Sequence, residues 1–336
     1  MMLFTRFTLA MLACLLSTPQ ALEANTRRHP VIVQPHEVLQ TKLETLSRAL
    51  SSGSLGISVL DIQSGAQWRI NGGEAFPMMS VFKVPVAAAV LERVDQGQIS
   101  LEHPITLSRA ELRGGASSIR DRFRGDRMTF TVRQLLHDSV SRSDNTATDA
   151  LIKLIGGPAA VTAFLRAHGI EGMRVDLNEQ GISDLLTHLG PSTPTLEKET
   201  PNAKDQRLRR GLQAFLVDPR NRSTPDAAVI FLQKLQNTTL LSHPSTRHLL
   251  DLMHRQTTPR RLRAGLSEGV TLADKCGTST SLNGVTAAYN DIGIMTWPDG
   301  RQVIVAAFLS ASKASRAERE RLFTEITQVI VETAQQ

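Results

Sequence analysis

The distribution of strand and helix patterns along the chain constrains its fold more than any other feature. Runs typical of β-strands occupy residues 55–71 and 270–310, whereas residues 101–253 have mostly helical periodicity with Pro and Gly interruptions. Strands from both ends of a chain bury their apolar faces most economically in one shared sheet. The sequence therefore predicts a two-lobed α/β (α+β) protein, with an antiparallel sheet built from both termini, flanked by helices, and an inserted all-helical lobe.

The domain boundaries follow from the same pattern. We expect a single domain over residues 25–336, with an α/β lobe at about 25–100 and 256–336 and a helical lobe at about 101–255. Residues 184–222 are rich in proline and charge and predict an exposed insertion with one short helix. Ligand sites commonly form at such junctions, so we expect a cleft where the two lobes meet.

The first residues are typical of an export signal. Arg6 supplies a positive start, an apolar core follows, and small residues near Ala24 offer a cleavage site. We expect residues 1–24 to be a signal peptide and the mature protein to be periplasmic or secreted; a lipoprotein attached through Cys14 is the alternative. No later apolar run reaches the roughly 18 residues of a membrane helix, so we expect no membrane span. Without Cys14, Cys276 is the only thiol, which excludes an intramolecular disulfide.

The positive charge of the chain is dispersed. Its formal net charge of +6 comes from lysines and arginines interleaved with acids, and only 4% of the residues are aromatic, so we expect no nucleic-acid partner. A basic surface suited to anionic cell-wall polymers is the simpler interpretation. The nine histidines lack the spacing of a metal site, so we expect no metal and no cofactor. We also expect a monomer.

Ser80 and Lys83 form the first candidate site. They head an apolar segment that predicts a helix over 81–98, and residues three apart share one face of a helix. A serine hydroxyl becomes a nucleophile when a base takes its proton, and a buried amine can be that base because burial disfavours its charged form. The alternative is that Ser80 caps the helix while Lys83 extends its ammonium group to the surface.

Two further motifs follow in the chain. The segment SDN at 143–145 precedes a helical run, and such triplets are most often helix N-caps. The segment DKCGT places Lys275 and Gly277 on a predicted strand, where glycine permits the close approach of a ligand and the lysine can attract a carboxylate. A solvent-facing lysine on an ordinary strand is the alternative.

The three motifs occur in a fixed order that is much rarer by chance than any one of them. S-x-x-K, S-D-N and K-T-G together are the signature of class A β-lactamases and penicillin-binding proteins. The chain resembles a class A serine β-lactamase over nearly the whole mature sequence, and SVFK, SRSDN, GGPAAV, TAAYNDIGI and PDGR are most similar to the extended-spectrum branch. The resemblance implies a β-lactamase/transpeptidase-like fold and hydrolysis of the β-lactam ring of antibiotics through a serine acyl-enzyme.

The resemblance also implies roles for the matching residues. Ser80 would be the acylated nucleophile, Lys83 its proton-handling partner, and Ser143 the relay of a proton to the leaving nitrogen. Backbone N–H groups of Ser80 and Thr278 would form the oxyanion hole. Substrate-binding roles are implied for Asn145, which would hold the side-chain amide of the substrate, and for Lys275, Gly277, Thr278 and Arg261, which would bind its carboxylate or lie against it.

Glu179 would supply the base that releases the acyl group. The segment MRVDLNEQGIS resembles the omega loop of the family, and its R-x-D-x-x-E spacing puts Glu179 where the glutamate that activates the deacylating water belongs. The chain departs from the family pattern at several points. Cys276 replaces the usual Thr or Ser of the third motif, no proline follows Glu179, and Ser183 stands in place of the residue that shares the water.

Two other functions remain open. A penicillin-binding or D-Ala-D-Ala peptidase-like acyltransferase would use the same serine but deacylate slowly. A non-catalytic relative would bind cell-wall fragments, and Cys276 and the insertion favour it. The intact motifs argue against this second alternative, because a retired site has no physical reason to keep a buried lysine. Hydrolysis of the β-lactam ring is therefore our prediction.

Overall fold

The computed structural model describes residues 35–189, 199–257 and 260–334. The predicted signal peptide at 1–24 lies outside the described residues, as does part of the insertion at 184–222. Residues Gln34–Gln336 form one compact unit. The strands of its main sheet are β1 (Ser54–Asp61), β2 (Gln67–Ile70), β7 (Thr271–Thr278), β8 (Ser281–Leu282), β9 (Val285–Thr296) and β10 (Gln302–Ser312).

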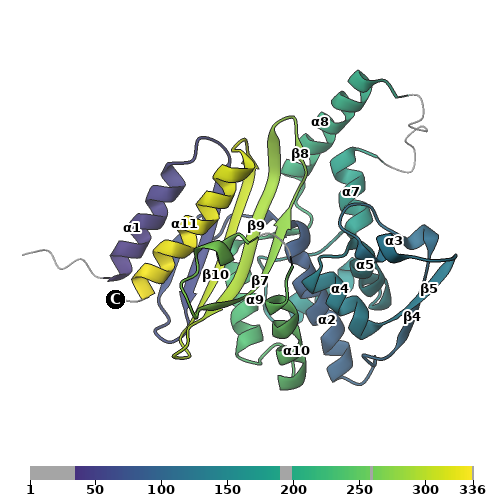
Figure 1. Cartoon of the computed structure of the whole chain (residues 1–336), viewed down its shortest axis with the longest axis horizontal. Helices are drawn as coiled ribbons and strands as arrows, with labels where there is room; N and C mark the ends of the chain where they lie inside the picture. Colours follow the sequence, from purple (N-terminus) through teal and green to yellow (C-terminus); the bar gives the residue numbers. More distant parts are fainter. Residues whose placement is uncertain (1–34, 190–198, 258–259, 335–336) are drawn as a thin grey trace, which may run out of the picture. The chain divides into compact units, whose positions relative to one another are not determined.

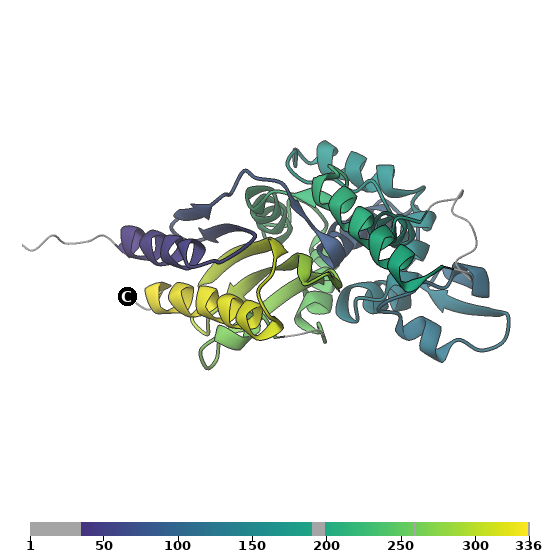
Figure 2. The ribbon, with the colours of Figure 1, turned by 90° about the horizontal axis from the view of Figure 1, so that it is seen from above.

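The main sheet joins the two ends of the chain, as the sequence predicts. Its strand order is β2-β1-β10-β9-β7, with β8 on β9, and the pairings are antiparallel. Helices α1 (Pro35–Arg48) and α11 (Arg316–Ala334) lie side by side against it (Figures 1 and 2). Helix α9 (Pro225–Gln236) also packs on β1, β9 and β10.

Strand β10 contributes to two hydrophobic cores because successive side chains of a strand point to opposite faces. Val303, Val305, Ala307 and Leu309 pack with the apolar residues of α1 and α11. Ile304, Ala306 and Phe308 pack with α9 and with the second lobe. The continuous apolar run that the sequence shows here is therefore a strand covered on both faces.

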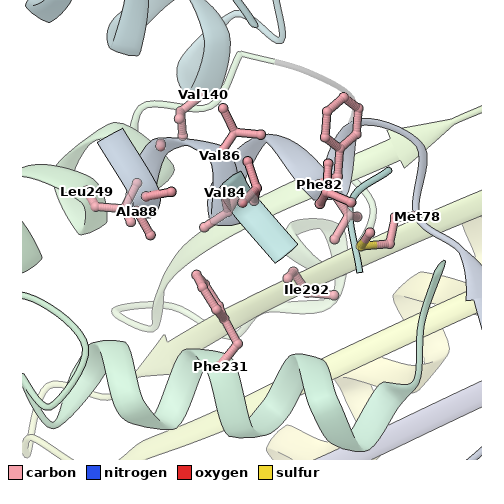
Figure 3. Packing of buried hydrophobic residues seen from close by; sticks show 14 of the residues in the cluster. Met78, Phe82, Val84, Val86, Ala88, Val140, Phe231, Leu249 and Ile292 are labelled. Atoms are coloured by element: carbon pink, nitrogen blue, oxygen red, sulfur yellow. The ribbon is translucent and has the colours of Figure 1, made fainter. Parts of the chain in front are cut away.

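The second lobe is built around α2 (Lys83–Asp95), which is buried from Lys83 to Leu91. A helix that is apolar all round belongs in a core. Helices α4 (Val132–Ser141), α5 (Asn145–Leu154), α6 (Pro158–Ala167) and α10 (His243–His254) pack against it. Figure 3 shows Val84, Val86 and Ala88 of α2 together with Val140, Leu249, Phe231 and Ile292 from the surrounding helices and the sheet.

The start of α2 differs from the prediction. Met79–Phe82 form a 3₁₀-helix, η1, so the α-helix expected from residue 81 begins at Lys83. Met79, the first residue of this turn, has a φ of 46°, so its backbone is left-handed and an α-helix cannot extend back through it.

Two other elements of the second lobe also differ from the prediction. The lobe is not all helical, since β4 (Pro104–Ser108) pairs with β5 (Arg127–Thr131), and threonine and other strand-favouring residues alternate there. The short helix expected in the insertion is α8 (Pro201–Val217), 17 residues long. Thr200 caps it, and Leu212 and Phe215 bury one face.

Among the described residues, no single helix is both long and apolar enough to cross a membrane. Helices α5 and α6 pass the same test only when taken together, and they are bent by 70° relative to each other. Most of their apolar side chains lie in the core of the second lobe, which accounts for their composition.

Candidate active site

One cavity of about 470 Å³ brings together residues that lie far apart in the sequence. Its lining includes Ser80 of η1, Asn145 of α5, Glu179 at the start of α7 (Glu179–Thr187), and Thr278 of β7. The edge of the sheet, the second lobe and α7 therefore meet at this point, where the sequence predicts a cleft. Lys83, Ser143 and Lys275 do not line the cavity but are joined to it by hydrogen bonds.

The backbone of β7 lies directly against the turn that carries Ser80. A Cβ atom at Gly277 would lie 3.1 Å from Ser80 N and would collide with Met78 O, so only glycine fits. Asn290 of β9 donates to Pro77 O at 2.7 Å and to Met78 O at 3.0 Å, and so holds the turn. This packing maintains the left-handed backbone at Met79, which costs about 1–3 kcal/mol.

Lys83 is fully buried and paired. Its Nζ donates to Ser143 O at 2.6 Å and to Asn145 Oδ1 at 2.7 Å, and it lies 2.9 Å from Glu179 Oε1. The alternative in which Lys83 reaches the surface is therefore wrong. Among the described residues no hydrogen bond joins Lys83 to the Ser80 hydroxyl; the ammonium group is held by Ser143 O, by Asn145 Oδ1 and by the charge of Glu179. Side chains three apart in a 3₁₀ turn are eclipsed, so Ser80 and Lys83 still share one side of η1.

Glu179 is positioned by the backbone at the start of α7. Its N–H donates to Asp149 Oδ1 at 2.7 Å, and Arg113 Nε holds the other oxygen of Asp149 at 2.6 Å. The Glu179 side chain is buried, yet among the described residues its Oε1 accepts no hydrogen bond of suitable angle, although Lys83 lies within ion-pair distance. This oxygen therefore keeps acceptor capacity beside the cavity. Ser183 lies four residues later on α7 and also lines the cavity.

Two ammonium groups lie near the hydroxyl of Ser143. Lys275 Nζ donates to Ser143 Oγ at 3.1 Å and Lys83 Nζ at 3.4 Å, and the backbone of Ser143 is left-handed, with a φ of 58°. Lys275 is fully buried, so the solvent-facing alternative for it is wrong. Burial lowers the pKa of Lys275 to about 8, and the positive charge of Lys83 acts in the same direction.

Gln256 is a site residue that sequence reasoning missed. Its Oε1 accepts from Lys275 Nζ and from Cys276 N, both at 2.9 Å, and its Nε2 donates to Asp274. It thereby fixes the lysine and the strand that carries it. Gln256 follows the C-terminus of α10 and belongs to no motif, so only its position in the fold reveals it.

The SDN segment is also a helix N-cap, which agrees with the simpler of its two interpretations. Asp144 caps α5 by accepting from Ala147 N at 2.9 Å, and it is fully buried. Asn145 donates to Gly114 O at 2.9 Å while it accepts from Lys83. The cap thus aims the Asn145 amide at the cavity, and capping and site formation use the same residues.

Arg261 lies behind the cavity rather than in it. The side chain is buried, stacks on the ring of Tyr289 at 3.8 Å, and donates to Gly277 O at 2.8 Å. It also donates to the hydroxyl of Thr278, a residue that lines the cavity. Arg261 therefore reaches the cavity only through Thr278.

The inserted helix α8 forms part of the cavity wall. Leu208 of α8 lines the cavity with Ile182 and Leu186 of α7. Arg207 donates to Thr187 O and pairs with Glu199 at 2.8 Å, which fastens α8 to the end of α7. A Cβ atom on Gly211 would collide with Leu186 O, so the two helices touch backbone to backbone. The insertion thus adds an apolar surface beside Glu179.

Comparisons with known proteins agree on one family. Residues 38–334 match the model of the "Beta-lactamase enzyme family". The chain is 36% identical to the extended-spectrum β-lactamase PER-1 of Pseudomonas aeruginosa over 77% of this chain and 75% of that protein, and 30% identical to β-lactamase VEB-1 of the same organism over 87% and 88%. A β-lactamase of Chitinophaga pinensis superimposes with a TM-score of 0.75 at 31% identity, covering 88% of this chain and 99% of the other. An ancestral class A β-lactamase gives a TM-score of 0.70 at 34% identity, with the same coverage.

Proposed function

Because this chain belongs to the class A serine β-lactamases and hydrolyses the β-lactam ring, we propose that Ser80 is its nucleophile and that Lys83, Ser143 and Glu179 move the protons. The observation that carries the proposal is the buried ammonium group of Lys83, which lies within 2.9 Å of groups belonging to Ser143, Asn145 and Glu179. A single charge there links the S-x-x-K and S-D-N motifs with the omega-loop glutamate.

Acylation begins when the Ser80 hydroxyl attacks the lactam carbonyl. Lys83 first gives an ammonium proton to Glu179, 2.9 Å away, and its neutral amine then takes the proton of the Ser80 hydroxyl. The developing oxyanion is held by the N–H groups of Ser80 and Thr278, which the contact at Gly277 brings together. Each such donor typically contributes about 2.7–4 kcal/mol to the transition state.

Opening of the ring requires a proton on the leaving nitrogen. Ser143 relays it: its hydroxyl proton goes to the nitrogen and is replaced by a proton from Lys83, while the ammonium group of Lys275 stabilises the negative charge on its oxygen. The proton held by Glu179 then returns to Lys83, which restores the carboxylate. Glu179 then takes a proton from a water molecule that attacks the Ser80 ester, and the bond to Ser80 breaks. The unsatisfied Oε1 of Glu179 supports this step, because it retains a lone pair for that water.

Substrate binding uses the remaining residues of the motifs. The Thr278 hydroxyl binds the substrate carboxylate and the buried charge of Lys275 attracts it, with Arg261 behind Thr278 and Gly277 allowing the close approach. Asn145 holds the side-chain amide of the substrate from the opposite wall of the cavity.

The chemistry is tested by incubating the protein with nitrocefin and mapping adducts by mass spectrometry. We expect turnover and, in samples quenched with acid, a mass increase confined to the peptide that contains Ser80. The control variant Ser80→Ala removes both signals. Absence of turnover together with absence of an adduct in the unmodified protein would refute the proposal, and an adduct that persists without turnover would favour the slow acyltransferase.

The pKa of Lys275 predicts a pH dependence. Since the pKa of Lys275 is about 8, the ammonium group is present below that pH and is lost as the pH rises through it. We expect kcat/KM for a carboxylate-bearing lactam to fall about tenfold per pH unit well above pH 8, mainly through a higher KM. The control is Lys275→Arg, whose charge persists, and whose profile should stay flat. The same decline in this variant would assign the titration to another group.

We further propose that residues 1–24 direct export. The mature chain of residues 25–336 then acts as a monomeric single domain in the periplasm or outside the cell. There it confers resistance to β-lactams. The export-like N-terminal sequence and the family support this. N-terminal sequencing of the exported protein is expected to begin near residue 25, with size-exclusion chromatography giving one chain. A full-length, cytoplasmic product would contradict the proposal.

A further inference from the structure

A second cavity, of about 680 Å³, shares no lining residue with the first. It lies against α4, α10 and β5, and its apolar surface comes from Met128, Phe130 and Leu252. Its basic residues are Arg122, Arg133, Arg142, Arg255, His137 and His248. The proposed function uses none of these residues.

The positive charge of this cavity exceeds its negative charge. Asp138 is the one carboxylate among its lining residues, and it lies within ion-pair distance of Arg122 and, at 3.6 Å, of Arg142. Arg133 is neutralised from outside by Glu102 at 2.8 Å. Among the described residues Arg255 has no ion pair. Arg122, Arg142 and Arg255 therefore share one lining carboxylate, and the charge of Asp251 offsets only part of what remains, so the cavity keeps a net positive charge.

His248 lies in this positively charged environment. Its Nε2 is buried and has no hydrogen-bond partner among the described residues. Burial lowers the pKa of His248 below its usual value, and the charges of Arg133, Arg255 and His137 lower it further, while Asp251 opposes them. The imidazole is thus neutral in a positive field, and its buried Nε2 lacks a partner.

We propose that this cavity binds a phosphate group, carried either by a soluble phosphate compound or by a lipid headgroup. A phosphate monoester carries close to two negative charges at neutral pH, which complements the net positive charge of the cavity. Guanidinium forks pair with phosphate oxygens in bidentate geometry. The apolar surface from Met128, Phe130 and Leu252 accepts the organic part of the ligand, and His248 Nε2 gains the partner that it lacks.

Binding is measured on the full chain with two probes. Inorganic pyrophosphate is titrated by calorimetry, and vesicles of phosphatidylcholine with or without phosphatidic acid are tested by co-sedimentation. We expect saturable binding of at least one probe that weakens as NaCl rises from about 50 to about 300 mM. Pyrophosphate alone identifies a soluble ligand, and vesicles alone identify a headgroup. In the unmodified protein the bound probe should also raise the pKa of His248. NMR titration measures this pKa, and the variant His248→Gln assigns the signal.

The double variant Arg142→Gln/Arg255→Gln removes two of the guanidinium groups that line the cavity. We expect it to bind the probe about tenfold more weakly, at roughly threefold for each exposed ion pair. The matched control is Arg316→Gln/Arg321→Gln on α11, which changes the net charge equally and should bind as the unmodified protein does. Thermal melting establishes that both variants are folded. Failure of both probes to bind, or equal weakening in the two double variants, would overturn the proposal.

Discussion

Replacing Glu179 with glutamine is expected to leave Ser80 reactive but to trap its acyl group. The amide of Glu179→Gln keeps the volume and position of the side chain, which α7 and Asp149 set through the backbone. It cannot take a proton from water, so deacylation loses its general base. A general base typically contributes 10²–10⁴-fold, and we expect kcat to fall by about that factor. Stopped-flow mixing with nitrocefin should show a burst of one equivalent followed by slow turnover.

A matched control separates loss of the base from loss of shape. Glu171→Gln makes the same chemical change in the loop that precedes α7, on a side chain exposed to solvent, and it should leave the burst and the steady rate unaltered. Mass spectrometry of Glu179→Gln should find the adduct on the Ser80 peptide long after mixing. An adduct lifetime equal to that of the unmodified protein would show that Glu179 is not the deacylating base.

The second large effect concerns Lys83 and Glu179 as a buried pair. Removing one member leaves the other charge buried without its partner, which typically costs about 3–5 kcal/mol. We expect Lys83→Met to lower the free energy of unfolding by about that amount and to abolish the Ser80 adduct, because the proton acceptor is gone. Urea denaturation measures the first effect and mass spectrometry the second.

The double variant Lys83→Met/Glu179→Gln tests whether the two groups interact. Once both charges are removed, the unpaired carboxylate is no longer present, so the double variant should be more stable than Lys83→Met alone. Its activity should not return, since both proton-handling groups are missing. Strictly additive losses of stability would mean that the 2.9 Å approach contributes nothing to folding.

Much of the fold could be predicted because each element carries its own pattern. The apolar runs and turn residues of β9 and β10 and the capping residues and apolar periodicity of α5 and α9 are local signals. The β4–β5 pair and the full length of α8 were missed. Short strands and inserted helices carry weak local patterns, and their stability comes from what they pack against.

The sequence by itself determined the order and chemistry of the motifs, and with them the family. Side-chain type and spacing along the chain suffice for that, because the motifs are short and local. Only the tertiary structure decided that Lys83 and Lys275 are buried, that Arg261 supports Thr278 from behind, and that Gln256 holds Lys275. Burial and pairing here depend on contacts between residues from 17 to 132 positions apart in the chain, and no local pattern encodes the charges that such segments present to one another.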